Sequence, residues 1–177
     1  MLENLFWVVL FGGIPVLLSY YVLMQDDEVS KLWAGLQGWV YYGWLGSMCL
    51  TVLSYFYLFY AFVWAAEDAM IFSWNIEDTE PFLCACYTVF LGSASQYAYL
   101  AITDVKNSER SLLLIANLWL TALMSLLIGS CAVALNHVDD TTNVLSIIAG
   151  LIFAVHHIGF DAIFWQQSFN PSYNQIV

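Results

Sequence analysis

Residues 112–135 read LLLIANLWLTALMSLLIGSCAVAL, and this stretch decides the class of protein. A membrane-spanning helix needs about 20 mostly apolar residues, and no charged residue interrupts this segment. The strands of a membrane barrel are about 10 residues long and alternate in polarity. Neither LLLI at 112–115 nor LFYAFVW at 58–64 alternates in this way. We therefore expect a transmembrane helix here.

Four further segments have the same character, and the linkers between them are too short for a soluble domain. No charge falls within the first four apolar cores, whereas the fifth contains His156, His157 and Asp161. The sequence predicts an all-α, integral membrane bundle of five transmembrane helices that forms a single domain over residues 1–177. The predicted spans are residues 5–24, 38–66, 81–103, 112–135 and 144–165.

The composition excludes the main alternative classes. The chain has 177 residues, of which 62% are hydrophobic and 10% are charged. A soluble domain is about half apolar and about a quarter charged, and a chain of this size cannot bury so much apolar surface. The net charge of −11 would repel a polyphosphate. We therefore expect the lipid bilayer, and no nucleic acid, as a partner.

The few basic residues predict the orientation in the membrane. Lys31 falls in the first predicted loop, and Lys106 and Arg110 fall in the third, so all three share one face. The positive-inside rule makes that face cytoplasmic, or matrix or stromal in an organelle. With five spans the N-terminus is then outside and the C-terminus inside, in a membrane that the sequence does not identify.

The opposite face is predicted to be acidic, without a basic residue to compensate. Its carboxylates produce a negative field that concentrates cations. The alternative interpretation is that short loops need solvated residues and that acids meet this need. The predicted outer acidic face consists of Glu3, Glu67, Asp68, Glu77, Asp78, Glu80, Asp139 and Asp140.

Small and polar residues form a stripe along several predicted helices. Inside lipid, such stripes mark the faces that touch protein or water. One interpretation is close helix packing, and the fifth helix then packs through Ser146, Gly150 and Ala154. The other interpretation is a hydrated polar cavity, lined by Gln96, Tyr99, Asn117, Thr121 and Ser125.

The most informative motif is HHIGFDAIFW at residues 156–165. His157 and Asp161 are four residues apart and share one face of an α-helix, while His156 is rotated by about 100°. A buried carboxylate needs a partner or water, so we predict a coupled His157–Asp161 pair that faces the interior. Such a pair can handle protons or cations, support a metal, haem or pigment ligand, act as acid and base, or simply tie the helices together.

Three functions follow from these features. The first is an oligomeric channel or transporter for cations or protons, with His157 and Asp161 on its pathway. The second is a non-catalytic subunit of a larger membrane complex, and the third is a lipid-phase enzyme or a pigment- or lipid-binding protein. Motifs such as H-E-x-x-H and G-x-S-x-G are absent from the sequence, which disfavours an enzyme. We predict no metal site formed by protein side chains alone, and no particular cofactor is indicated.

Overall fold

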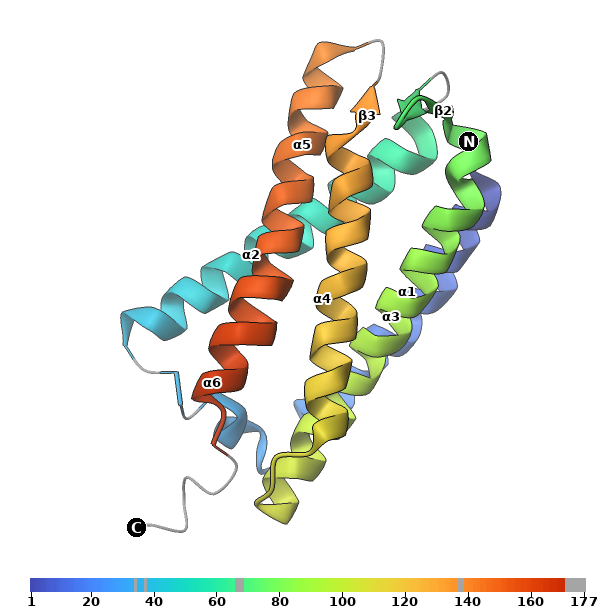
Figure 1. The fold of residues 1–177 in the computed structure, drawn as a ribbon. Coiled ribbons are helices and arrows are strands. Elements are labelled where there is room, and N and C mark those ends of the chain that lie inside the picture. The colour runs from blue at the N-terminus through green and yellow to red at the C-terminus, as the bar shows by residue number, and fades with distance from the viewer. Residues whose placement is uncertain (34, 37, 66–68, 137–138, 171–177) are drawn as a thin grey trace.

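The computed structural model describes residues 1–33, 35–36, 38–65, 69–136 and 139–170, and this part of the chain is mainly helical (Figure 1). Two of the long helices continue as π-helices, in which each hydrogen bond spans five residues. The long helices are α1 (Glu3–Leu23), α2 (Trp39–Tyr60), α3 (Ile76–Asn107), α4 (Leu112–Val133) and α5 (Asp140–Val155). The short helical elements are the 3₁₀ turn η1 (Val29–Trp33), the π-helices η2 (Ala61–Ala65) and η3 (His156–Trp165), and α6 (Gln166–Ser168).

A small antiparallel sheet ties two loops together at the end of the bundle that holds the N-terminus (Figure 1). Its strands are β1 (Met70–Ile71), β2 (Trp74–Asn75) and β3 (Leu135–Asn136), in the order β2–β1–β3. Ile71 pairs with Trp74 on one side and with Leu135 on the other. Phe72 and Ser73 turn the β1–β2 hairpin with φ of 51° and 71°, as a two-residue turn that follows the strand twist requires.

Four helical stretches are long and apolar enough to cross a membrane. They are Glu3–Leu23, Trp39–Trp64, Leu112–Val133 and Asp140–Ser168. This confirms the expected helical membrane protein, but the span predicted at 81–103 is not confirmed by the same measure. That segment lies inside α3, whose 32 residues include an acidic first turn and many small or polar residues. Since α3 packs between α1 and α4 (Figure 1), much of its surface meets protein and does not need aliphatic side chains.

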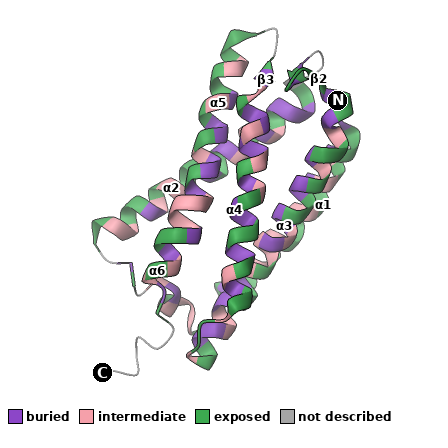
Figure 2. Ribbon diagram, viewed as in Figure 1, coloured by how far each residue is buried: buried purple, intermediate pink, exposed green. Residues whose placement is uncertain are grey.

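The outward surfaces are apolar, as is usual for a protein surrounded by lipid. Leu17 on α1 is 74% exposed and Leu113 on α4 is 62% exposed. Exposed residues dominate α1, where Leu5, Val9 and Leu23 are the buried ones, whereas buried and exposed residues alternate along α4 (Figure 2). Polar residues such as Ser125 and Ser146 are fully buried. Apolar side chains on the outside and polar side chains in the interior therefore partly reverse the distribution found in a soluble protein.

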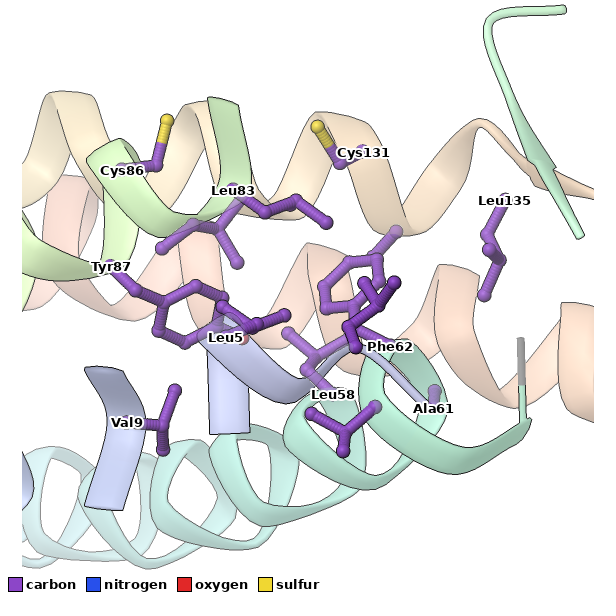
Figure 3. Close-up of a cluster of buried hydrophobic side chains, with 14 of the residues drawn as sticks. Leu5, Val9, Leu58, Ala61, Phe62, Leu83, Cys86, Tyr87, Cys131 and Leu135 are labelled. Carbon is purple, nitrogen blue, oxygen red and sulfur yellow. The ribbon is translucent and has the colours of Figure 1, made fainter. Parts of the chain in front are cut away.

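The core divides into two clusters along the bundle. The first lies in the half near the N-terminus and includes Leu58 and Phe62 from α2 and η2, with Leu83 and Tyr87 from α3 (Figure 3). The second lies in the other half, where α3, α4 and η3 meet. It includes Leu32, Ala101, Leu114, Ala162 and Trp165.

A close helix contact lies between α4 and α5. A Cβ atom built on Gly150 would stand 2.8 Å from the carbonyl oxygen of Gly129 and 2.8 Å from Cβ of Ala132. Ser146 and Ala154, one turn on either side of Gly150, are also buried. The predicted packing face of the fifth helix is therefore present, and it lies against α4.

Candidate functional site

The site is built on the change from α-helix to π-helix at His156. The backbone of α5 ends at Val155, and η3 continues the same helix from His156 to Trp165. In a π-helix the hydrogen bonds join residues five apart, so that residue i+5 lies on the next turn beside residue i. Such segments are frequent at functional sites. Here the change of period alters which histidine faces Asp161.

His156, from η3, connects the carboxylate of Asp161 to the hydroxyl of Ser47 on α2. Ser47 Oγ lies 2.9 Å from His156 Nδ1, and His156 Nε2 lies 3.5 Å from Asp161 Oδ2. The imidazole is 4% exposed, and the Asp161 side chain is 25% exposed. We call these three residues the Ser47–His156–Asp161 chain.

Aromatic side chains enclose the carboxylate end of this chain. Trp44, one turn before Ser47 on α2, lies with its indole Nε1–H 3.4 Å from the second oxygen of Asp161. Trp33 from η1 packs on Trp44 with ring centroids 4.5 Å apart. Trp165, one turn beyond Asp161, donates its Nε1–H to the carbonyl of Leu32 over 3.2 Å. The loop before α2 is thereby fixed across the site.

When Asp161 is ionised, the partners of the two imidazole nitrogens determine which atoms of the Ser47–His156–Asp161 chain donate a proton and which accept one. A carboxylate only accepts hydrogen bonds, so His156 then presents Nε2–H to Asp161. The Nδ1 atom of a neutral imidazole is then an acceptor, and Ser47 donates its hydroxyl proton to it. We assign this tautomer from the network. A proton that leaves Ser47 would therefore move toward the carboxylate.

The structure pairs Asp161 with His156, in place of the expected His157. The expectation used the period of an α-helix, in which residues four apart share a face, and the π-helical backbone replaces this relation with a spacing of five. His157 Nδ1 instead lies 2.8 Å from the carbonyl oxygen of Phe153, one turn earlier. Its ring packs edge-on against Phe153 and against Phe90 of α3.

The five residues predicted to line a cavity do not share one space. Asn117, Thr121 and Ser125 are buried along α4, where Thr121 donates to Ser93 Oγ of α3 over 2.8 Å. Their stripe is thus mainly a packing contact. Gln96 is exposed, and Tyr99 is 70% exposed.

Two hollows of the described structure lie on the outside of the bundle, between α1 and α3. One has a volume of about 270 Å³ and includes Ser19, Asp26 and Tyr99 in its lining. The other has a volume of about 370 Å³ and lies beside Gly12 and Gly92. Both are open grooves, and neither includes a residue of the Ser47–His156–Asp161 chain.

The acids of the predicted outer face lie mainly at the beginnings of helices. Glu80 accepts hydrogen bonds from the backbone N–H groups of Asn4 and Leu5, at 2.9 and 3.2 Å. Asp139 accepts from the N–H of Thr142 at 2.9 Å and caps α5. The remaining described acids occupy first turns, where the helix dipole favours negative charge. These are Glu3 on α1, Glu77 and Asp78 on α3, and Asp140 on α5; Glu67 and Asp68 lie outside the described residues.

The three basic residues gather at the other end of the bundle, each with a local partner. Lys106 Nζ lies 2.5 Å from Asp26 Oδ2, and this hydrogen bond lowers the pKa of Asp26 and raises that of Lys106. Lys31 pairs with Glu28. Arg110 donates to the carbonyl of Phe169. The first and third loops therefore share one end of the bundle, together with Phe169 and opposite Met1 (Figure 1).

The possible metal-ligating side chains are scattered over the described part of the chain. Across residues 1–33, 35–36, 38–65, 69–136 and 139–170, no three His, Cys, Asp or Glu side chains converge as ligands would. Cys49, Cys84, Cys86 and Cys131 are free thiols. His137 lies outside the described residues.

The fold and site define a helical protein of the membrane-spanning class with a partly buried Ser–His–Asp chain. Comparison with protein-family models, with curated proteins and with solved structures found no match for the sequence or the fold. The sequence prediction included Asp161 but chose His157 as its partner, and it did not place His156, Ser47 or Trp44 in the site. The stripe of Gly43, Ser47, Thr51 and Ser54 on α2 was the available signal, because a polar seam on a facing helix is where a buried histidine finds a partner.

Proposed function

We propose that the protein moves protons in a membrane, as a small channel or transporter in which His156 and Asp161 are the exchanging groups. The observation that carries this proposal is the Ser47–His156–Asp161 chain, with His156 almost fully buried and Asp161 partly exposed. Ionisable residues inside a membrane are costly and are retained mainly for function. Histidine can also accept a proton at one ring nitrogen and donate one from the other, as a proton shuttle requires.

A proton fits the geometry better than a hydrated cation. A hydrated ion needs a continuous pore that reaches the exchanging groups, and neither of the two grooves between α1 and α3 includes them in its lining. A proton needs only a sequence of hydrogen-bonding groups. Asp161 lies on the half of the bundle near the basic loops and is the more exposed member of the pair. We infer that it exchanges protons with that side and passes them to His156.

The orientation and the fifth span form part of this proposal. With α3 as a further span, Met1 and the end of α6 lie on opposite sides of the membrane, with the basic loops on the cytoplasmic, matrix or stromal side. Impermeant thiol reagents can test this on single cysteines placed at Asp78 and Ser108, in a chain whose four native cysteines are replaced. We expect labelling from opposite sides; labelling from one side would contradict the fifth span.

Proton flux into liposomes tests the function directly. Asp161→Asn preserves the shape of the side chain and removes its charge, so we expect proton flux to fall at least tenfold. His157→Gln is the matched control, because His157 lies on the same helix and outside the chain, and its flux should remain within twofold of wild type. Equal flux for wild type and Asp161→Asn would contradict the proposal.

A second candidate function, as one subunit of an assembly, is favoured by the open flank of α2. Trp39 is 83% exposed and Tyr42 is 71% exposed, and no atom lies within 4 Å of a Cβ built on Gly43 or Gly46. Glycines on an exposed helix face permit a neighbouring helix to approach closely. The mass of the complex in mild detergent tests this candidate, with Gly46→Leu as the disrupting variant. A monomeric wild-type mass would contradict it.

A further inference from the structure

We propose that Ser47 is an activated nucleophile that takes acyl groups from lipid-phase esters, with His156 as its base and Asp161 as the positioning residue. The inference rests on the same chain as the proposed proton function. It adds a chemical reaction to that chain, and it assigns to Ser47 a role that a proton carrier does not need. A serine becomes a useful nucleophile when an adjacent base removes its proton and a third group orients that base.

The three side chains meet this requirement in their order and in their contacts. The hydroxyl of Ser47 lies at hydrogen-bond distance from the imidazole nitrogen, at 2.9 Å. The other imidazole nitrogen faces the carboxylate of Asp161 at 3.5 Å, and Trp44 lies near the second carboxylate oxygen. The imidazole is therefore held between a hydroxyl and a carboxylate, which is the arrangement by which serine nucleophiles are recognised on unrelated folds.

Ser47 lies beside the open flank of α2, although its hydroxyl faces His156. Its side chain is only partly buried. Gly46 precedes it in the chain and Gly43 lies one turn earlier, and a Cβ on either glycine would find no atom within 4 Å. A substrate can thus approach the hydroxyl beside two positions without side chains. Ser47 lies about 12 Å along α2 from Trp39. Because α2 crosses the bundle obliquely (Figure 1), the difference in membrane depth between these two residues is smaller than this distance.

The reaction balances without a cofactor. Ser47 Oγ attacks the carbonyl carbon of the ester while its proton passes to His156 Nδ1. The carbon–oxygen bond to the alcohol then breaks, and the alcohol leaves with that proton. A water molecule repeats the sequence on the acyl-serine, releases the fatty acid and restores Ser47. Asp161 stabilises the imidazolium and remains ionised.

The surroundings of Ser47 predict a slow turnover. Ser47 lies inside α2 (Trp39–Tyr60), where the backbone N–H groups are engaged in the helix and cannot stabilise an oxyanion. Loss of one such donor costs about 10²–10³ in rate. Covalent labelling is therefore a more sensitive readout than product release, because it needs a single attack.

The test uses a long-chain alkyl fluorophosphonate, from which Ser47 would displace fluoride. We expect wild-type protein, in detergent and in liposomes, to form one adduct that mass spectrometry locates on Ser47. Ser47→Ala should abolish the adduct, whereas Ser54→Ala, a change of the same kind two turns along α2, should preserve it. In Asp161→Asn the labelling rate should fall at least tenfold, and Asp161→Glu, which keeps the carboxylate, should recover part of that rate.

Each outcome bears on one proposal. An adduct that persists in Ser47→Ala, or a wild-type protein that does not react, would overturn the nucleophile. An unchanged labelling rate in Asp161→Asn would overturn the assigned role of Asp161. Flux that depends on Asp161 in a protein that does not label would leave the proton function standing and would exclude the nucleophile.

Discussion

The two halves of the last long helix differ in backbone, in partner and in chemistry. The first half, α5, is α-helical and packs against α4 through Ser146, Gly150 and Ala154, with no room for a larger side chain at Gly150. The second half, η3, is π-helical and presents His156 and Asp161 to α2. A stripe of small residues thus continues into a polar chain on one helix. The change of helical period at His156 separates a packing surface from a chemical one.

The largest effect on stability is expected from Gly150→Leu in the first half. The added side chain would overlap the backbone of Gly129 and Cβ of Ala132, both 2.8 Å from the position of a Cβ atom. Overpacking of this kind costs about 3 kcal/mol at the upper end of its usual range, so the melting temperature should fall markedly.

Gly159→Ala is the control for that change, since no atom lies within 4 Å of its Cβ position. It should leave the melting temperature unchanged or raise it slightly, because alanine is favoured over glycine in a helix by about 0.5–1 kcal/mol. Equal melting temperatures for wild type and Gly150→Leu would show that α5 does not press on α4.

A smaller loss of stability is expected from His156→Ala in the second half. This change leaves the Ser47 hydroxyl and the Asp161 carboxylate without their common partner, and an unsatisfied buried polar group costs about 1–3 kcal/mol. We expect a value near the middle of that range, because Asp161 is 25% exposed and can be partly solvated. Chemical unfolding in detergent can measure it.

His157→Ala provides the comparison within the same turn. His157 bonds only to the carbonyl of Phe153 in the described structure, so its removal leaves no charged group unpaired. The loss should be smaller than for His156→Ala. The reverse order would support the α-helical pairing of His157 with Asp161.

The smallest effect is expected at the basic end of the bundle, where Lys106 pairs with Asp26. The folded state lowers the pKa of Asp26 below 3.8 and raises that of Lys106 above 10.5, chiefly through their mutual hydrogen bond. The acid contribution is present above pH 3.8 and disappears as the pH falls through the lowered pKa of Asp26. The lysine contribution is present below pH 10.5 and disappears as the pH rises through its raised value.

The difference in melting temperature between wild type and Asp26→Asn should therefore be constant between these limits and shrink below pH 3.8. Asp27 and Glu28 also act on Lys106, and Asp27→Asn removes the same charge from the neighbouring residue as a control. A wild-type advantage that grows on acidification would contradict the assignment.

The contrast between α5 and η3 also shows which features the sequence can predict. Long apolar runs identify four spanning helices, and the spacing of Ser146, Gly150 and Ala154 correctly predicts a packing face, because both patterns depend on the period of an α-helix. The segment at 81–103 has the length of a span, but its small and polar residues make it less apolar than the four spans. Such residues suit a helix that packs between other helices, as α3 does.

The candidate site was only partly predictable. His156 and Asp161 are visible as unusual residues in an apolar segment, but the π-helix that joins them has no signature in the residues that the prediction used. Ser47 belongs to a helix more than one hundred residues earlier in the chain, and its distance from His156 depends on how α2 crosses α5. The predicted acidic outer face was also visible in the sequence. Glu80 and Asp139 accept hydrogen bonds from the backbone N–H groups of Leu5 and Thr142, and these contacts depend on where the helices begin.

The pairing of Asp161 with His156 is the central claim, and two double-mutant cycles test it most directly. One cycle combines His156→Ala with Asp161→Asn, and the other combines His157→Ala with Asp161→Asn. We predict a coupling free energy of about 1–2 kcal/mol for the first cycle, as contacting residues show, and a value within about 0.5 kcal/mol of zero for the second. Additive effects in the first cycle together with coupling in the second would contradict the π-helical pairing and the chain built on it.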